Sequence, residues 1–131
     1  MPVVAVDYPI ADRVLLKATG MINLSEMIMV MAYFRSTDSR LKSILVDLQD
    51  ATISVSATEV ESLAQMMASE MKKAPMGPVG LIATNDEVFG MARMYQAYST
   101  ASGRSEVGVF RDLSSAERWL ERFLPKGSDN V

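Results

Sequence analysis

The sequence predicts an α/β domain built on a mostly parallel sheet. Short apolar runs rich in β-branched residues, such as Ser43–Leu48 and Val79–Ala83, are typical of strands that are covered on both faces. Between these runs lie longer segments with apolar residues three or four positions apart, which is the period of an amphipathic helix. Strands that alternate with helices in this way are joined by right-handed crossovers and run parallel.

The first two strands are expected to form an antiparallel hairpin. We expect them at Val3–Tyr8 and Arg13–Thr19, because the short link Pro9–Asp12 does not leave room for a parallel crossover. Gly20 is expected to close the hairpin.

The first helix is apolar on nearly all sides. It is expected to begin at a cap formed by Asn23 or Ser25 and to run to about Arg35. One face carries Leu24, Met27, Ile28, Met31 and Phe34, and the other carries Met29, Val30 and Tyr33. A helix of this kind is buried on two sides. Its second face packs either under the edge of the sheet or against a partner.

The middle of the chain predicts a buried strand and a long helix. Ser43–Leu48 is expected to be the strand, and Gln49–Val55 a connection of moderate length. Ser56 and Glu59 have the spacing of a capping box, which starts a helix that runs to about Lys73.

The stretch Gly77–Leu120 contains the remaining elements. Asn85 or Asp86 is expected to cap a helix that follows the strand Val79–Ala83 and ends before Gly103. The apolar face of this helix consists of Val88, Met91, Ala92, Tyr95 and Tyr98.

A last strand and a last helix complete the predicted fold. The strand is expected at Glu106–Phe110, and Ser114 with Glu117 has the spacing of a capping box for the helix. Trp119 is expected on the inner face of that helix. The order is therefore β-β-α-β-α-β-α-β-α, with a five-stranded sheet and four helices. We expect one domain over residues 1–124 and a flexible tail over 125–131.

Composition limits the chemistry that this chain can perform. The 131 residues carry a net charge of −3 and contain neither cysteine nor histidine, which excludes thiol nucleophiles, Cys/His zinc sites and a Ser-His-Asp triad. The basic residues are scattered, so nucleic acid is not expected as a partner. The N-terminus has no signal-peptide pattern and no apolar run is long enough to span a membrane, so we expect a cytoplasmic protein.

The chain resembles the SpoIIAA-like branch of the STAS superfamily, also described as STAS/SEC14-type domains. The resemblance rests on the opening hairpin and on Ile44–Leu48 followed by a long helix. Its most specific part is Val88–Tyr95, followed by Val109–Asp112 and by Ala116, Trp119 and Leu120. It covers nearly the whole chain and implies a mixed, mostly parallel sheet with helices packed on it.

The resemblance also allows a comparison with the phosphorylation site of STAS domains. Better-known STAS domains are anti-sigma-factor antagonists that are switched by phosphorylation of a serine in a D-S-x-G motif. The corresponding residues here are Val55, Ser56, Ala57 and Thr58, so only the serine is present. We favour the capping role for Ser56 over that of a phosphorylation site.

Three other groups of residues allow a functional interpretation and a structural one. The carboxylates Asp47, Asp50, Asp86 and Asp112 follow predicted strands, where a cation or a phosphoryl group is conceivable, although caps and turns explain most of them. Arg93 either binds an anionic group on a partner or pairs with Asp86 or Glu87. The eleven methionines either fill the core or line a site for a lipid-like ligand, and we favour the core.

The sequence therefore predicts a non-enzymatic interaction or regulatory module. We expect it to bind a regulatory protein or a second copy of itself, as a dimer, through apolar helix faces. The predicted contact residues are Met29, Val30, Tyr33, Met91, Arg93, Met94 and Tyr98. The alternative is a domain that binds a small apolar or lipid-like ligand. No catalytic residue, metal site or cofactor is expected.

Overall fold

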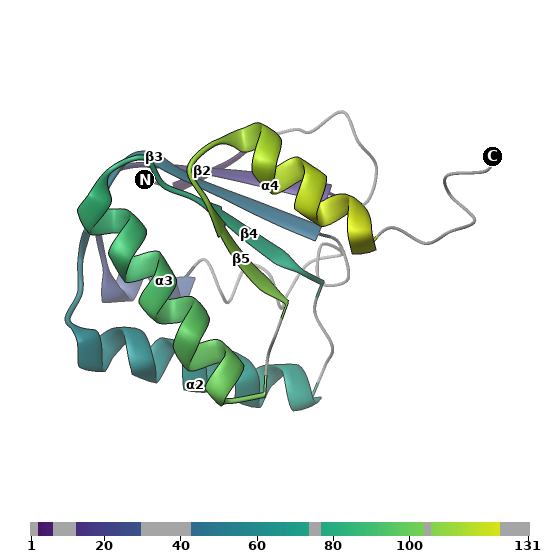
Figure 1. Ribbon diagram of the computed structural model, residues 1–131. Coiled ribbons are helices and arrows are strands. Elements are labelled where there is room, and N and C mark those ends of the chain that lie inside the picture. Colours follow the sequence, from purple (N-terminus) through teal and green to yellow (C-terminus); the bar gives the residue numbers. More distant parts are fainter. Residues whose placement is uncertain (1–2, 7–12, 30–42, 74–76, 104–105, 124–131) are drawn as a thin grey trace.

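A sheet with the strand order β1-β2-β3-β4-β5 forms the centre of the molecule (Figure 1). The computed structural model describes residues 3–6, 13–29, 43–73, 77–103 and 106–123. Strands β2 to β5 are parallel to one another, and β1 pairs antiparallel with β2 at one edge. The predicted α/β class, with a mostly parallel sheet and an antiparallel first pair, is confirmed.

The elements follow the predicted segments closely in the second half of the chain. The strands are β1 (Val3–Val6), β2 (Arg13–Asn23), β3 (Ser43–Ser54), β4 (Val79–Ile82) and β5 (Val107–Phe110). The helices are α2 (Ala57–Lys73), α3 (Asp86–Ala101) and α4 (Leu113–Leu120), followed by the 3-10 turn η2 (Glu121–Phe123). Residues 24–29 are also helical. The predicted link at 9–12, the end of the first helix and the tail at 125–131 lie outside the described residues.

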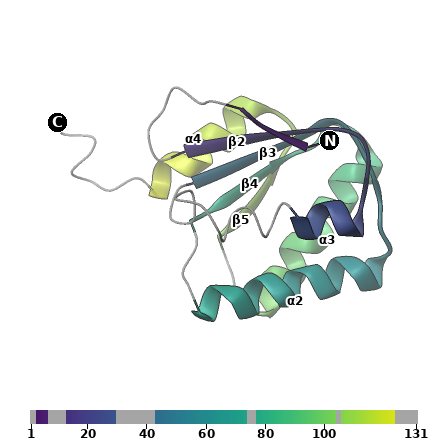
Figure 2. The same ribbon diagram turned by 180° about the vertical axis from the view of Figure 1, so that it is seen from behind.

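Helices cover both faces of the sheet. Helices α2 and α3 lie on one face and α4 lies on the other, and Figure 2 shows the short helix over 24–29 on the same side as α2. The core beneath α2 contains Leu16, Ile44, Leu63 and Met67, whereas Leu45, Ile82, Ala116 and Leu120 form the core beneath α4. Strand β3 is therefore buried from both sides.

Strands β2 and β3 continue beyond the rest of the sheet as a two-stranded ribbon. Pairing with β4 stops at Asp47, but Thr19–Asn23 remain paired with Asp50–Ser54 after a bulge. The ribbon bends over the N-terminal end of α3 (Figure 2), where Ile22, Ala51 and Val88 belong to one buried cluster.

Two sequence-based expectations about this ribbon are wrong. Gly20 does not close the second strand, and Gln49–Val55 is not a loop, because the pairing of β2 with β3 runs on to Ser54. Gly20 has a φ of 72°, a left-handed conformation that glycine adopts without steric cost. It therefore bends the ribbon without ending it.

A buried arginine ties β2 to α4. The Arg13 side chain donates from Nε to Ser43 Oγ at 3.4 Å, and its Nη1 lies 4.0 Å from Glu117 Oε2 of α4. Burial lowers the pKa of Arg13, and the negative charge of Glu121 opposes that shift. Glu117 of α4 and Glu121 of η2 therefore compensate a cation beneath the helix.

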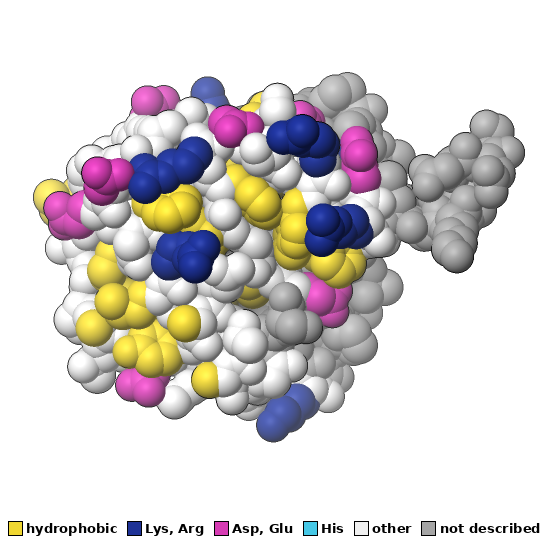
Figure 3. Space-filling view, viewed as in Figure 1, with side chains coloured by type: hydrophobic (Ala, Val, Ile, Leu, Met, Phe, Trp, Pro, Cys, Tyr) yellow, Lys and Arg dark blue, Asp and Glu magenta, His cyan; other side chains and the backbone are white. Residues whose placement is uncertain are grey.

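The face formed by α3, β5 and α4 combines apolar and basic side chains. In the space-filling view, Lys and Arg side chains alternate with hydrophobic ones across the middle of this face, and acidic side chains lie mostly toward its rim (Figure 3). This arrangement differs from the scattered distribution of the same residues along the sequence.

An aromatic cluster fixes α4 against β5. The rings of Phe110 and Trp119 have centroids 5.5 Å apart, and Trp119 meets Phe123 edge-on at 4.9 Å. A Cβ atom added at Gly108 would lie 2.6 Å from Phe110 Cε2 and 3.1 Å from Trp119 Cδ2. Only glycine therefore lets both rings lie on this strand.

We predict that Gly108→Ala lowers the free energy of unfolding by about 1–3 kcal/mol, because the added methyl group must displace a packed ring. Urea denaturation followed by tryptophan fluorescence measures this change. Gly90→Ala is the matched control, since nothing lies within 4 Å of a Cβ atom there. In the middle of α3 that substitution should stabilise by about 0.5–1 kcal/mol. Equal effects of the two variants would contradict the packing argument.

A second prediction concerns Ser99 in α3, which is fully buried and whose Oγ has no hydrogen-bond partner in the described part of the chain. Ser99→Ala should raise the free energy of unfolding by about 1 kcal/mol, because it removes an uncompensated polar group. The control is Thr100→Ala, where the hydroxyl is exposed and already donates to Gln96 O at 3.0 Å. A destabilised Ser99→Ala variant would show that the hydroxyl has a partner in solution.

Candidate functional site

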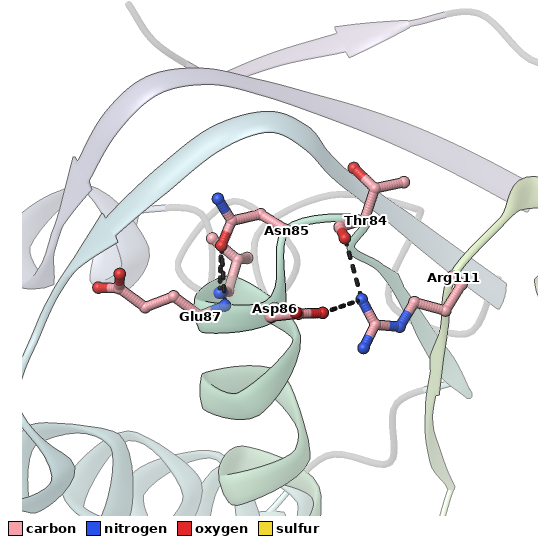
Figure 4. Close-up of polar contacts among 6 residues, drawn as sticks. Thr84, Asn85, Asp86, Glu87 and Arg111 are labelled. Atoms are coloured by element: carbon pink, nitrogen blue, oxygen red, sulfur yellow. Dashed lines mark hydrogen bonds and ion pairs between the residues drawn. The ribbon is translucent and has the colours of Figure 1, made fainter.

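The carboxyl ends of β4 and β5 bring a group of polar side chains together at the start of α3 (Figure 4). Asn85 caps this helix, and its Oδ1 accepts hydrogen bonds from the backbone N–H groups of Glu87 at 2.8 Å and Val88 at 3.2 Å. Of the two caps that the sequence allowed, the structure therefore uses Asn85. Asp86 is the first residue of α3 and has a different partner.

Arg111 joins the two strand ends. Its Nη1 donates to Thr84 O at 2.9 Å and to Asp86 Oδ1 at 2.9 Å (Figure 4). Its guanidinium carbon lies 3.8 Å from the centre of the Phe89 ring, a cation–π distance. The ion pair is exposed, so we expect it to contribute little stability by itself. Its effect is to hold one face of the guanidinium on the ring.

Arg111 and Phe89 lie in the segments that carry the resemblance, but no functional role was predicted for either. The pairing joins residues 25 positions apart, so no local motif reveals it. The one available signal was topological: Arg111 follows β5 directly and Asp86 follows β4. Neighbouring parallel strands end at the same edge of a sheet, which places the two charges together.

Asp112 caps α4, and the predicted capping box of Ser114 and Glu117 is wrong. The Oδ1 atom of Asp112 accepts from the backbone N–H of Ser115 at 2.8 Å. This hydrogen bond, with a second from the Ser115 hydroxyl, lowers the pKa of Asp112, and Arg118 adds to the shift. The cap is fully effective above the ordinary aspartate pKa of about 3.9 and is lost as the pH falls through the lowered value.

The four aspartates that were considered for a cation or phosphoryl site have separate structural roles. Asp47 accepts from the Gln49 N–H at 3.0 Å, and Asp50 lies within β3 rather than in a loop. Asp86 pairs with Arg111, and Asp112 caps α4. Among the described residues, no group of three or more acidic side chains is arranged to hold a metal ion.

The predicted contact residues of helix α3 differ in their exposure to solvent. Met91, Met94 and Tyr98 are half-buried, and Arg93 is exposed. The expected pairing of Arg93 with Asp86 does not occur, because Arg111 occupies that carboxylate. No ion pair of Arg93 is seen within the residues that the structure describes.

The first helix presents one predicted contact residue clearly. Met29 is 52% exposed, and Ile28 on the same turn is 36% exposed. Val30 and Tyr33 lie outside the described residues. Asn23 and Glu26 form a reciprocal cap at 3.0 Å in each direction, which starts this helix at the end of the ribbon.

Several methionines belong to the core. Met67 is buried on the inner face of α2, and Met27 packs against two of the hydrophobic clusters. Others are exposed, with Met21 at 67% and Met66 at 39%. Thioethers therefore both fill the interior and add apolar surface.

Ser56 lies at the start of α2, as the capping box predicted. Its Oγ accepts from the Glu59 N–H at 3.2 Å, and Glu59 Oε1 accepts from the Ser56 N–H at 2.8 Å. The serine is exposed. A phosphate placed here would lie beside the Glu59 carboxylate, which repels it, and at the N-terminus of α2, which favours negative charge.

The helices of the described residues include none long and apolar enough to span a membrane.

We predict that Ser56→Ala lowers the free energy of unfolding by about 1 kcal/mol, because α2 loses its capping oxygen. Thermal unfolding measures this change. Ser56→Asp should retain most of the stability, since its carboxylate can accept the same N–H. The control is Thr58→Ala, an exposed first-turn position that should change stability by less than about 0.5 kcal/mol. No loss in Ser56→Ala would show that the cap is dispensable.

Comparison with known proteins adds information on the fold. No protein-family model matches the chain. No curated protein matches it either. Among solved structures, it is similar to an uncharacterized protein of the DUF3478 family with a SpoIIAA-like fold from Shewanella loihica PV-4. The two are 16% identical, with a TM-score of 0.58 over 90% of this chain and 93% of the other. Together with the parallel sheet and the helices on its two faces, this similarity shows that the chain has a SpoIIAA-like fold.

Proposed function

We propose that the chain is a protein-interaction module of the STAS type, which binds a second copy of itself or a regulatory protein through the segment 21–29. The observation that carries this proposal is the exposure of Met21, Ile28 and Met29, at 67%, 36% and 52%. They follow one another on the bent ribbon and the helix that it leads into. Large apolar side chains gathered on one segment are typical of association surfaces.

The rigid support of this segment favours binding over a merely frayed end. Ile22 is buried with Ala51 and Val88, and Met27 packs against the same cluster. The exposed Met21 and Ile28 are therefore each next in sequence to a side chain that packs into the core. A surface held in this way loses little conformational entropy when a partner covers it.

The residues on α3 are assigned a smaller part in this function. Met91, Met94 and Tyr98 are already half-buried within the chain, so a partner gains less apolar area from them than from Met29. The lipid-like ligand remains the alternative. The packing of Met27 and Met67 in the core gives it no positive support.

We predict that Met29→Lys weakens self-association by about tenfold or more, because burial of a methionine contributes about 1.5–3 kcal/mol and a lysine ammonium resists desolvation. Native mass spectrometry at micromolar concentration measures the monomer–dimer ratio. The fold should be unaffected, since Met29 is 52% exposed.

The matched control is Leu113→Lys, which replaces a 38% exposed apolar residue of α4. It should leave the dimer intact. A monomeric wild-type protein would contradict self-association, and a reproducible added mass on that monomer would favour the ligand-binding alternative.

A further inference from the structure

Among the described residues, no strand pairs with the outer edge of β5. This strand is the last of the sheet. Val79 N–H donates to Glu106 O at 3.0 Å and Ala83 N–H donates to Phe110 O at 2.9 Å. In a parallel ladder, the backbone groups of the intervening residues Val107 and Val109 then point away from β4. Gln96 Nε2 donates to Val107 O at 2.9 Å, which leaves the backbone of Val109 facing outward.

Arginines and aromatic rings flank this edge on both sides. From α3 come Phe89 and Arg93, which are four residues apart and therefore lie on one side of the helix. From α4 and η2 come Arg118 and Arg122 with the same spacing, next to Trp119. Arg111 follows the end of β5 and covers Phe89. We call this group the β5-edge surface, and its face of the molecule is the one shown in Figure 3.

The acidic residues of α4 lie on its other side. Glu117 is within 4.0 Å of Arg13, and Glu121 acts electrostatically on the same arginine. Arg118 and Arg122 are each one residue further along the chain, which is a rotation of about 100° around the helix axis. Along α4 and η2 the two charge signs therefore point in different directions, with the glutamates acting on Arg13 of β2 and the exposed Arg118 and Arg122 turned away from it.

Nearby carboxylates neutralise only part of the β5-edge surface. Asp86 pairs with Arg111, and Asp112 uses an oxygen as the cap of α4. Glu106 is half-buried at the start of β5. Arg93 and Arg122 form no ion pair within the described residues. Arg93 belongs to α3 and Arg122 to η2 at the end of α4, and these two helices cover opposite faces of the sheet (Figure 1).

We propose that the β5-edge surface binds an extended acidic segment of a partner protein. Such a segment can pair its backbone with Val109, as strands do when they extend a sheet. Its carboxylates can then meet Arg93 and Arg122, because guanidinium groups bind carboxylates through two parallel hydrogen bonds. The rings of Phe89 and Trp119 supply apolar contact. The proposal rests on the function as a protein-interaction module but uses a different surface from Met29.

Two observations favour an acidic peptide over a nucleic acid. The chain has a net charge of −3, and acidic side chains lie toward the rim of this face, so a long polyphosphate backbone would be repelled outside the centre. The open backbone edge also complements a polypeptide strand, which a nucleic acid does not provide.

The test uses a fluorescent synthetic peptide of about ten residues that alternates Glu and Thr, so that its carboxylates share one face when it is extended. Fluorescence anisotropy with the full chain should show binding. The same peptide with Gln in place of Glu should bind at least about tenfold more weakly. Hydrogen exchange should show slower exchange of the Val109 N–H in the complex.

Variants with reversed charges test where on the protein the peptide binds. Arg93→Glu with Arg122→Glu should reduce the affinity at least about tenfold. Lys17→Glu with Lys72→Glu makes the same change in net charge at exposed positions on β2 and α2 and should change the affinity by less than about twofold. Equal losses from both pairs would overturn the proposed site, as would equal binding of the Gln peptide.

Two further outcomes separate this proposal from its alternatives. Tighter binding of a single-stranded oligonucleotide of the same length would overturn the choice of an acidic peptide. Unchanged exchange at Val109 would overturn strand pairing. Met29→Lys should leave peptide binding intact, so that failure of the self-association test and failure of this test can be told apart.

Discussion

Burial of β3 from both faces is the constraint on which the rest of the structure depends. Ile44 and Leu45 are neighbours in sequence, both have 0% exposure, and they belong to the two clusters on opposite sides of the sheet. Successive side chains of a strand point to opposite faces, so one short segment must hold α2 on one side and α4 on the other. A shift of one residue in its register would exchange the two sets of contacts.

The helices on the two faces of the sheet are positioned by their packing on this central strand and its neighbours. Helix α4 packs on β3, β4 and β5, and its approach to the outer strand depends on the absence of a side chain at Gly108 beneath Phe110 and Trp119. The same packing places Trp119 on Phe110 of β5, next in sequence to the exposed Arg118. The beginning of α3 is fixed by the Asn85 cap and by the ribbon of β2 and β3 that covers Val88. Core packing thus determines which polar groups meet at the surface.

Features encoded within a few residues could be predicted from the sequence, and features encoded across strands could not. The cap at Ser56 needs only Glu59, three positions away, and its prediction is correct. The continuation of β3 through Asp50 depends on pairing with Thr19, 31 positions earlier, and polar residues at that point resemble a loop. The prediction of the α4 cap was wrong for a different reason. Asp112 and Ser114 both offer an acceptor oxygen, and only the backbone geometry selects Asp112. The residues of α3 that were predicted to contact a partner do lie on a helix, but periodicity alone does not give their exposure.

The net charge of the sequence does not describe the local charge of the folded surface. The net charge of −3 describes the whole chain, but at physiological ionic strength exposed charges interact only over about 8 Å. A partner at the edge of β5 therefore experiences Arg93 and Arg122 more strongly than the acidic residues elsewhere. The folded chain contributes to this contrast by placing the Glu117 carboxylate beside Arg13 of β2. The local sign of the surface, rather than the net charge of the protein, therefore decides which partner segment it fits.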